Sequence, residues 1–360
     1  MSNKNKKVCV AMSGGVDSSV VAALMKDQGY DVFGVTMCFS IVHPESKKPS
    51  CCGVEGIADA KRVAQILDIP HYVLDFAGDI QEYIIDNFVS EYINGRTPNP
   101  CVRCNQFLKF GTLYEKVRSL GADYLATGHY ARIESCPEGH TYLMKKAVDI
   151  KKDQSYFLYS IPKETLPHLL FPLGGMTKDE VRGLAEKYQL NTANKPESQD
   201  ICFVPDTGYK KFIKDRVGEG VFIPGDFIDH EGKVVGQHQG IMNYTIGQRD
   251  KLGIALGVPV YVYKIDKENN IVYVGPREYL FSQGLIAKDF NALKIIKEKM
   301  EVRARIRYNA PEIKGNLVCL ENKEIQINFT EPQMSVTPGQ SVVLYDGDVV
   351  LGGGIIKERI

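Results

Sequence analysis

The sequence has little of what marks a membrane protein, a secreted protein or a strongly charged nucleic-acid binder. Its 360 residues carry 44 Lys and Arg against 44 Asp and Glu. The net charge therefore gives no sign of a nucleic-acid partner, although a local basic surface stays open. No apolar run approaches the ~18 residues of a membrane helix, and the N-terminal residues lack the apolar stretch of a signal peptide. We therefore expect a cytoplasmic protein with no membrane partner.

Cysteine is also sparse. Nine cysteines in 360 residues are too few for a disulfide scaffold, and in a cytosolic chain clustered cysteines more often serve catalysis or bind metal. Local clusters occur at Cys51-Cys52 and at Cys101-x-x-Cys104. Neither is followed by a second CxxC, which argues against a four-cysteine zinc ribbon.

The N-terminal part of the chain alternates between strand-like and helix-like segments. Apolar residues over 60–67 recur at the spacing of one helix face, and Thr177 with Glu180 forms the capping box of a later helix. Such alternation predicts an α/β fold with a doubly wound, mainly parallel sheet. Short strands of this sheet are predicted at 7–12, 31–37, 71–75 and 123–127.

The pattern changes after residue 205. Residues 206–276 mix glycine and polar residues with short strands, which indicates a small central domain. Farther on, Ile325, Ile327 and Phe329 alternate with polar neighbours, and Asp346-Gly347 has the composition of a hairpin turn. We expect three domains, at 1–205, 206–276 and 277–360, of which the last is an antiparallel β-barrel.

The most specific motif is SGGVDSS at Ser13–Ser19, directly after the first predicted strand. Its two glycines permit a tight turn that exposes backbone N–H groups. Those groups, the serine hydroxyls and the N-terminus of the following helix form a cradle for an anion such as pyrophosphate. No Walker A lysine follows, and no GxGxxG is present. The motif resembles the PP-loop of the ATP pyrophosphatase superfamily, which splits ATP between its α and β phosphates to adenylate a substrate. A plain glycine-rich turn is the alternative.

Two cysteines in polar sequence contexts indicate sulfur chemistry. Cys104 follows Arg103 and precedes Lys109, and a nearby cation or a helix N-terminus lowers the pKa of a thiol. Cys202 lies in the stretch Glu197–Phe203. The superfamily holds both amide-forming synthetases and RNA thiolases, and the two thiols favour a thiolase. A buried structural role is the alternative for each cysteine.

With these residues in view, the chain is similar to the tRNA-specific 2-thiouridylases, which place sulfur at C2 of the wobble uridine of tRNA. The resemblance runs from end to end through motifs in a fixed order: SGGVDSS, GRTPNPCVRCN, ATGHYAR, KDQSYFLY, SQDICF and TPGQSVVLYDGDVVLGGG. It implies a PP-loop catalytic domain over 1–205, a central tRNA-binding domain over 206–276 and a C-terminal β-barrel over 277–360. It also implies ATP, Mg²⁺ and a tRNA with a wobble uridine as ligands.

The resemblance assigns roles to single residues. It makes Cys104 the nucleophile and Cys202 the carrier of a persulfide. It implies contacts to ATP for Ala11, Met12, Ser13, Gly14, Gly15, Val16, Asp17, Ser18, Met37 and Gly128. The target base is expected at Asn99, Pro100 and Cys101, and further tRNA contacts at His129, Lys152, Asp153, Gln154, Arg307, Tyr308 and Gln340.

The chemistry explains why ATP and two thiols are needed. The C2 oxygen of uridine is a poor leaving group, and adenylation converts it into AMP. Asp17 helps to place Mg²⁺ on the pyrophosphate, where the metal neutralises developing charge. The persulfide on Cys202 attacks C2, and Cys104 then forms a disulfide with Cys202; a partial exchange of these parts is the alternative. A cysteine desulfurase or a sulfur relay protein is the expected persulfide donor.

One departure from the family pattern opens a second mechanism. Many members have Asp three residues before the nucleophile, where this chain has Cys101. Cys101, Cys104 and Cys202 could then hold a 4Fe–4S cluster with one iron open to sulfur; a simple substitution at a base contact is the other interpretation. More distant alternatives are a PP-loop amide-forming synthetase, and a tRNA-binding or iron–sulfur protein without catalysis.

Two further segments bear on the ligands. Arg303, Arg305 and Arg307 alternate with apolar residues along a predicted strand, which places three arginines on one exposed face that suits phosphates. A solvated barrel face is the alternative. Cys51-Cys52 lies in a segment rich in Pro, Ser and Lys, which we interpret as a loop over the ATP pocket. A metal site that includes His43 is the alternative there.

Overall fold

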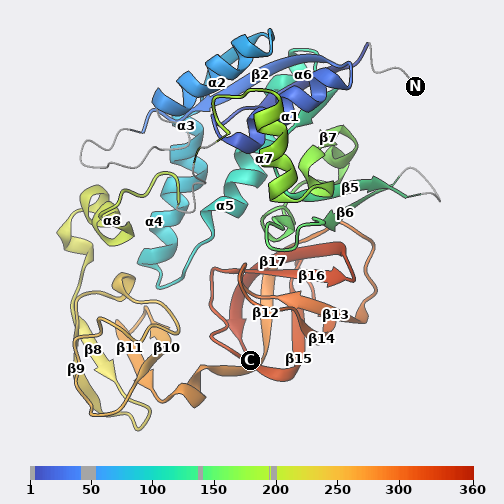
Figure 1. The fold of residues 1–360 in the computed structure, drawn as a ribbon. Helices are drawn as coiled ribbons and strands as arrows, with labels where there is room; N and C mark the ends of the chain where they lie inside the picture. The colour runs from blue at the N-terminus through green and yellow to red at the C-terminus, as the bar shows by residue number, and fades with distance from the viewer. Residues whose placement is uncertain (1–4, 42–53, 137–140, 194, 196–200) are drawn as a thin grey trace. The chain divides into compact units, whose positions relative to one another are not determined.

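The computed structural model describes residues 5–41, 54–136, 141–193, 195 and 201–360. The chain forms two compact units, and the colours of Figure 1 follow the chain from its N-terminus to its C-terminus. Unit 1 comprises Met1–Ile84, Cys101–Asp206 and Asp348–Val350, and unit 2 comprises Ile85–Pro100, Thr207–Gly347 and Leu351–Ile360. Within the part of the chain that is described, no helix is long and apolar enough to cross a membrane.

Unit 1 is built on a parallel sheet of five strands in the order β3-β2-β1-β4-β7 (Figure 1). Val8, Cys9 and Val10 of the central strand are fully buried, because a central parallel strand is covered on both faces. The predicted α/β fold is confirmed, and the four predicted strands match within one residue at each end. The strands are β1 (Lys7–Ala11), β2 (Asp31–Cys38), β3 (His71–Asp75), β4 (Tyr124–Ala126) and β7 (Leu169–Leu170).

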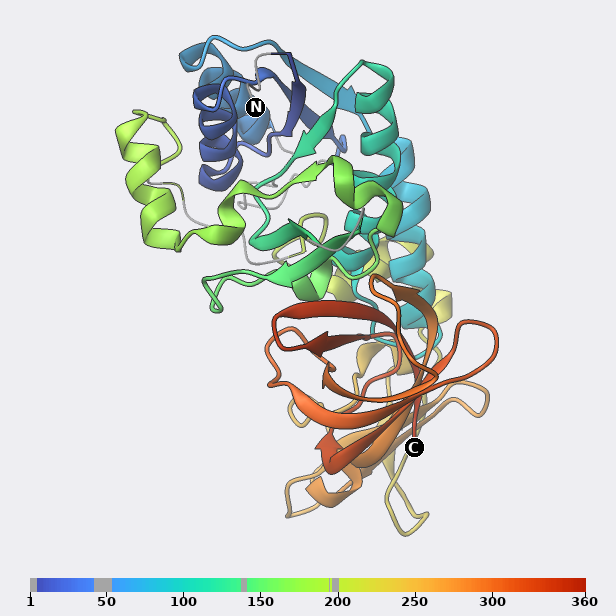
Figure 2. The same ribbon diagram turned by 90° about the vertical axis from the view of Figure 1, so that its right-hand side faces the viewer.

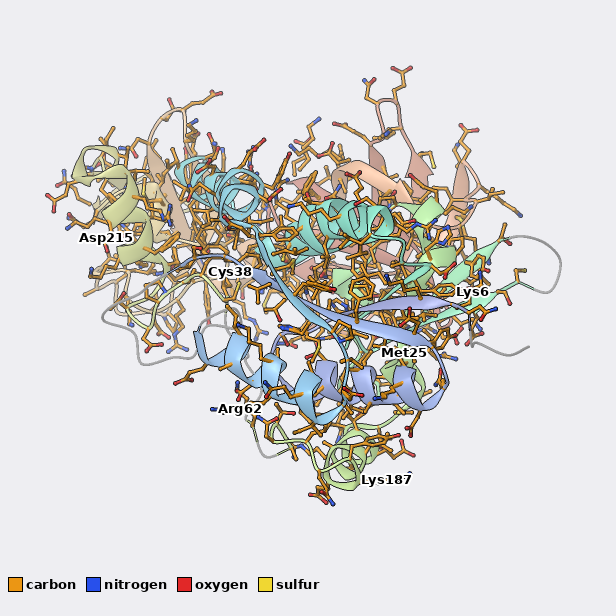
Figure 3. The ribbon with its side chains drawn as sticks, turned by 90° about the horizontal axis from the view of Figure 1, so that it is seen from above. Lys6, Met25, Cys38, Arg62, Lys187 and Asp215 are labelled. Carbon is orange, nitrogen blue, oxygen red and sulfur yellow. The ribbon has the colours of Figure 1, made fainter. Side chains whose placement is uncertain are left out.

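Helices lie on both sides of this sheet (Figure 2; Figure 3). One side carries α1 (Val16–Asp27), α2 (Val54–Ile66) and α7 (Lys178–Lys187). The other side carries a continuous helical stretch made of α5 (Pro100–Arg103), η2 (Cys104–Leu113) and α6 (Tyr114–Ser119). The remaining elements are α3 (Ala77–Ile80), η1 (Gln81–Ile85), β5 (Ala131–Ser135), β6 (Tyr142–Lys146), η3 (Ser155–Phe157), η4 (Lys163–His168) and η5 (Pro172–Gly175).

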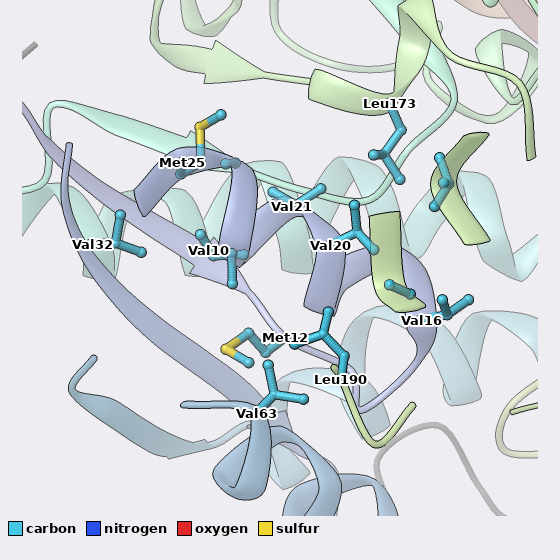
Figure 4. Close-up of a cluster of buried hydrophobic side chains, with 14 of the residues drawn as sticks. Val10, Met12, Val16, Val20, Val21, Met25, Val32, Val63, Leu173 and Leu190 are labelled. Atoms are coloured by element: carbon cyan, nitrogen blue, oxygen red, sulfur yellow. The ribbon is translucent and has the colours of Figure 1, made fainter. Parts of the chain in front are cut away.

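The core of unit 1 anchors both ends of the turn between β1 and α1 (Figure 4). Val10 and Met12, at the end of the strand, belong to the same buried cluster as Val16, Val20 and Val21 of the helix. The apolar face of α7, with Val181 and Ala185, packs against α1 and belongs to the same cluster. Because protein interiors are packed at crystal-like density, the turn is held between two fixed ends.

η2 is a ten-residue π-helix, which the sequence did not predict. Its buried side chains are those of Asn105, Leu108, Phe110 and Leu113. π-Helical stretches are rare and often occur at functional sites. This one begins at Cys104, the residue that the motif analysis singles out.

Unit 2 contains a four-stranded sheet in the order β10-β11-β8-β9. Phe227, Val262, Val272 and Val274 are fully buried in its core. The antiparallel strands β10 and β11 lie on either side of the turn at 267–270, in the region where the sequence predicts short strands. The strands are β8 (Gly225–Ile228), β9 (Val234–His238), β10 (Tyr261–Asp266) and β11 (Ile271–Gly275), and the helices are α4 (Asp86–Ile93), α8 (Tyr209–Val217), η6 (Glu219–Val221), η7 (Ile241–Asn243) and η8 (Arg277–Leu280).

Six strands close into an antiparallel β-barrel, as predicted. They follow the order β12-β15-β14-β13-β16-β17, and β12 pairs with β17 to close the ring. Ile325, Ile327 and Phe329 face its core, which confirms the alternation in the sequence. The turn between the last two strands falls at Gly347–Asp348, one residue later than predicted. The strands are β12 (Phe281–Ala292), β13 (Lys299–Arg305), β14 (Ile313–Cys319), β15 (Ile325–Met334), β16 (Ser341–Asp346) and β17 (Val349–Arg359).

The cap of α7 gives a test of the local structure. The Thr177 side chain accepts a hydrogen bond from the Glu180 backbone N–H, and the Glu180 carboxylate accepts one from the Thr177 N–H at 2.7 Å. We expect Thr177→Ala to lower the free energy of unfolding by about 1 kcal/mol, because an N-terminal N–H of the helix loses its acceptor. Denaturant unfolding measures this loss. Thr177→Ser keeps the acceptor, so an equal loss in both variants would contradict the capping role.

Candidate active site

The motif Ser13–Ser19 forms the turn between β1 and the first turn of α1. Gly15 is the N-cap of α1, so no side chain caps this helix, and its first N–H groups are left for an anion. Ser18 Oγ accepts a hydrogen bond from the Ser13 N–H at 3.2 Å, and Ser19 Oγ donates to Gly15 O at 2.8 Å. These bonds hold the backbone in the shape of an anion cradle.

Two glycines allow other segments to approach this cradle. Gly14 has a φ of +73°, and a Cβ there would lie 2.2 Å from the carbonyl oxygen of Gly56 on α2. A Cβ on Gly128 would lie 3.0 Å from Asp17 Cβ and 3.1 Å from Ser18 N. The fold therefore brings Gly128 against the stretch from Ala11 to Ser18. Met37, also expected at ATP, lies on the adjacent strand β2 and is 9% exposed.

The Asp17 carboxylate is held by two donors from elsewhere in unit 1. The Tyr130 hydroxyl donates to Asp17 Oδ1 at 2.9 Å, and Lys178 Nζ donates to the same oxygen at 2.7 Å. A second lysine, Lys195, donates to Gly14 O at 3.1 Å. The loop has no lysine in its own sequence, and the fold brings two lysines to it.

Cys104 begins η2 and is partly exposed. Of the two cations that lie near it in sequence, Arg103 donates through Nε to Tyr83 O at 2.9 Å. Its guanidinium also lies over the Phe107 ring, 4.6 Å from the centroid. Lys109 stands five residues beyond the cysteine, which is about one turn of a π-helix.

Lys109 contacts an imidazole in the motif ATGHYAR. Lys109 Nζ lies 3.4 Å from His129 Nε2, and His129 Nδ1 lies 2.7 Å from Thr127 Oγ1. The rings of Phe110 and Phe171 pack against the imidazole, each at 5.7 Å between centroids. Burial, followed by the charge of Lys109, lowers the pKa of His129 well below its ordinary value. The network assigns a neutral ring that accepts at Nε2 and donates from Nδ1.

The three cysteines considered for a 4Fe–4S cluster do not form a metal site. Cys101 is exposed, and Cys104 and Cys202 are partly exposed. Across the described residues, no group of three or more His, Cys, Asp or Glu side chains is placed to hold a metal ion. The donor set does not fit the cluster, so this alternative is not favoured. The seven described cysteines all carry thiols.

In unit 2, the turn that precedes the cysteine motif is bonded to a turn of the barrel. Gln340 Nε2 donates to Thr97 O at 2.9 Å and to Pro98 O at 3.3 Å. Gly339 has a φ of +91°, and a Cβ there would lie 2.9 Å from Thr97 N and O. This close approach fixes the chain just before Asn99 and Pro100. Gln340 therefore has a positioning contact within its own chain.

The predicted row of three exposed arginines is wrong in part. Arg303 is exposed, and the apolar residues between the arginines are buried as expected. Arg305, however, pairs with Glu312 at 2.9 Å with side chains only 12% and 14% exposed. Arg307 donates to Ser335 O at 2.8 Å, and the next residue, Tyr308, is partly exposed. A strand pattern cannot reveal acceptors that come from other strands and turns.

The expected tRNA segment Lys152–Gln154 has one partly exposed cation and two residues that hold the chain. Asp153 is 2% exposed and accepts hydrogen bonds from its own chain, including one from Ser155 Oγ at 2.9 Å. Gln154 Oε1 accepts from the Tyr130 N–H at 3.1 Å. Lys152 is partly exposed.

Sequence reasoning missed Lys178 and Tyr130, which both hold Asp17. One signal was present: a lysine directly after an N-cap opposes the helix dipole, and such local conflicts often mark functional sites. The expectations for Cys51-Cys52 and His43, and for the first part of the Cys202 motif at 197–200, lie outside the described residues.

Three family models match the chain in order. Residues 6–206, more than half of the chain, match the model described as tRNA methyl transferase HUP domain. Residues 210–276 match the tRNA methyl transferase PRC-barrel domain. Residues 282–356 match the aminomethyltransferase beta-barrel domain.

Curated relatives match over the whole length. The tRNA-specific 2-thiouridylase MnmA 1 of Caldanaerobacter subterraneus subsp. tengcongensis is 50% identical over 99% of each chain. The tRNA-specific 2-thiouridylase MnmA of Carboxydothermus hydrogenoformans is 51% identical over 99% of this chain and 98% of its own. A solved 4-thiouridine synthetase–RNA complex with bound ATP covers 59% of this chain and 51% of its own at 15% identity, with a TM-score of 0.35.

His129 predicts a pH dependence of stability. Its folded-state pKa is lowered, so the unfolded chain takes up a proton that the folded chain does not as the pH falls through about 6.5. Stability therefore falls on that acid side. We expect His129→Gln to flatten this fall, measured as the free energy of urea unfolding between about pH 5 and 8. His230, which is exposed in unit 2, provides the control: an equal flattening by His230→Gln would exclude His129 as the cause.

Proposed function

The chain belongs to the family of tRNA-specific 2-thiouridylases, and we propose that it uses ATP to replace the C2 oxygen of the wobble uridine of tRNA with sulfur. It is a tRNA sulfurtransferase, an enzyme of tRNA modification that binds ATP. The observation that carries the proposal is 50% identity over 99% of the chain. The anion cradle at Ser13–Ser19 supplies the matching chemistry.

Activation of the base is assigned to the cradle. The N–H groups of the first turn of α1 and the hydroxyls of Ser13 and Ser18 suit a pyrophosphate, and Met37 and Gly128 border the nucleoside. The C2 oxygen of uridine attacks the α phosphorus, and the bond to the β-phosphate oxygen breaks, so pyrophosphate leaves with the electron pair. Asp17 would hold Mg²⁺, which neutralises the charge that develops on this leaving group.

Sulfur transfer is assigned to the two thiols. The terminal sulfur of a Cys202 persulfide attacks C2 of the adenylated base, and AMP leaves with the former C2 oxygen. The Cys104 thiolate then attacks the Cys202 sulfur, which forms a Cys104–Cys202 disulfide and releases 2-thiouridine. An external dithiol must reduce this disulfide before the next turnover. A cysteine desulfurase or a sulfur relay protein supplies each new persulfide sulfur.

The target base and the tRNA are assigned to residues on both sides of the cysteine motif. Asn99, Pro100 and Cys101 meet the base. Further contacts fall at His129, Lys152, Arg307, Tyr308 and Gln340. Asp153 and Gln154 act by holding the chain beside Lys152, since Asp153 is 2% exposed.

The proposal assigns a separate role to each of the three predicted domains. Residues 1–205 carry the chemistry, while 206–276 and 277–360 serve tRNA binding. A tRNA substrate and an intracellular sulfur donor place the activity in the cytoplasm. The base must leave its stack to reach an enclosed nucleotide site, which is the general requirement for chemistry on a single base.

Methyl transfer is the competing reaction, because two of the matching family models are described as tRNA methyl transferase domains. The two reactions give different products, because thiolation exchanges one oxygen for sulfur and methylation adds a carbon. Mass spectrometry of nucleosides from treated tRNA separates them. The thiols of Cys104 and Cys202, together with about 50% sequence identity to the 2-thiouridylases, favour thiolation.

The two-thiol scheme predicts the behaviour of serine variants. Cys104→Ser and Cys202→Ser should each reduce 2-thiouridine formation by more than about 100-fold, because a hydroxyl neither carries sulfur nor forms a disulfide. Both should still release AMP from ATP in the presence of tRNA, because activation precedes sulfur transfer. The measurement is nucleoside mass spectrometry together with AMP release.

Cys136→Ser is the matched control, since Cys136 is another partly exposed thiol of unit 1. It should leave both reactions unchanged. Thiolation by either Cys104→Ser or Cys202→Ser at the parent rate would overturn the scheme. A methylated product would overturn the assignment of the reaction.

A further inference from the structure

Lys178 is a buried cation that the proposed chemistry does not use. Its side chain is 8% exposed, and a buried charge is costly unless it is paired. It also occupies the first position of α7, directly after the Thr177 cap. A positive charge in the first turn of a helix is unfavourable toward the helix dipole. The stability of α7 therefore does not explain why a lysine stands there.

The partner of Lys178 is Asp17. Lys178 Nζ and the Tyr130 hydroxyl both donate to Asp17 Oδ1, at 2.7 Å and 2.9 Å. Among the described residues, the hydrogen bonds to this carboxylate all end on Oδ1. Lys178 Nζ also lies over the Tyr130 ring, 5.6 Å from the centroid. The three side chains thus form one cluster, in which Oδ2 remains available to a ligand.

The backbones of Lys178 and Tyr130 are both hydrogen-bonded to the segment 149–154. The Lys178 backbone N–H donates to Asp149 Oδ2 at 3.1 Å. The Tyr130 backbone exchanges two hydrogen bonds with Gln154, one to the side-chain oxygen at 3.1 Å and one from the backbone N–H at 2.8 Å. Both donors to Asp17 are therefore fixed to the chain between 149 and 154. From these fixed backbones, the two side chains hold the Asp17 carboxylate by Oδ1.

The residues around the Ser13–Ser19 loop fit a pyrophosphate that carries a metal ion. Gly14 packs against Gly56 of α2, and Gly128 packs against Asp17 and Ser18, with no room for a Cβ at either position. Both glycines therefore fix the loop around Asp17. Asp17 is 30% exposed. A hard cation such as Mg²⁺ prefers carboxylate oxygens, and it usually binds one or two carboxylates together with substrate phosphates. The residues present fit that description.

We propose that Lys178 is a positioning residue, which together with Tyr130 holds Asp17 by Oδ1 so that Oδ2 binds the metal of the Mg²⁺–ATP complex. The proposal rests on the proposed function for the identity of the nucleotide. It also assigns Lys178 the task of balancing the charge of Asp17 before the nucleotide arrives.

The first experiment measures the interaction between Asp17 and Lys178 through the thermal stability of the protein. Asp17→Asn removes the carboxylate charge that pairs with the buried Lys178 ammonium at 2.7 Å, so the Tm should fall by several degrees. Lys178→Met added to Asp17→Asn also removes the ammonium charge, so the double variant should regain most of the lost Tm. Two additive losses would show that the residues do not act as a pair and would overturn the proposal. This experiment uses no substrate, so its outcome is independent of the proposed reaction.

The second experiment tests the orientation of Asp17 by measuring how much Mg²⁺ strengthens ATP binding. We expect calorimetry to show that Mg²⁺ strengthens ATP binding to the parent protein. Lys178→Met should abolish most of this gain while the affinity for metal-free ATP changes less than about 3-fold, and Tyr130→Phe should cause a smaller loss of the same kind. AMP release with tRNA should fall in kcat by at least about 10-fold for Lys178→Met.

Lys187→Met is the matched control, since Lys187 is an exposed lysine of the same helix (Figure 3). It should change neither binding nor kcat. An unchanged Mg²⁺ gain in Lys178→Met, or equal losses of ATP affinity with and without Mg²⁺, would overturn the positioning role. If the parent protein binds Mg²⁺–ATP but thiolates no tRNA, the proposed function fails while the role of Lys178 can still be read.

Discussion

The close approach of Gly14 to α2 is the constraint on which the site depends. Gly14 has a left-handed backbone, and a Cβ there would lie 2.2 Å from Gly56 O. Glycine reaches this conformation without strain, and the turn then aims the N–H groups of α1 at one point. The packed cluster around Val10 and Val20 holds both ends of the turn. A side chain at Gly14 would push α2 away or open the turn, and either change would remove the cradle.

A second constraint is the supply of positive charge. A Walker-type loop carries its lysine in its own sequence. Here Lys178 of α7 pairs with Asp17, and Lys195, which also pairs with Asp59 at 2.6 Å, donates to Gly14 O. The arrangement ties the anion site to parts of unit 1 that are remote in sequence. Lys178 is fixed by Asp149, and Tyr130 is fixed by Gln154. Both donors to Asp17 are therefore hydrogen-bonded to the segment 149–154, which includes the residues expected to meet tRNA.

The sequence predicted the α/β sheet, the capping box and the barrel because each has a local signal. Strand bounds such as 71–75 follow from apolar runs, and the burial of Ile325 and Ile327 follows from strict alternation. Long-range partners have no such signal. Arg305 was expected on an exposed face, and its partner Glu312 lies beyond the end of the strand. The pairing of Lys178 with Asp17 has no local signal for the same reason, since the two residues are 161 positions apart in the sequence.

The sequence places two cations near Cys104, and the π-helix that begins at Cys104 decides where each of them lies. Arg103 and Lys109 are both close to Cys104 in the chain, yet the guanidinium of Arg103 is bound over Phe107. In an α-helix, a residue five positions on would face well away from the cysteine. In the π-helix η2, the backbone hydrogen bonds join i and i+5, so Lys109 is rotated less far from Cys104 about the helix axis than it would be in an α-helix. The ammonium of Lys109 contacts His129, whose neutral Nε2 accepts a hydrogen bond from Lys109 Nζ.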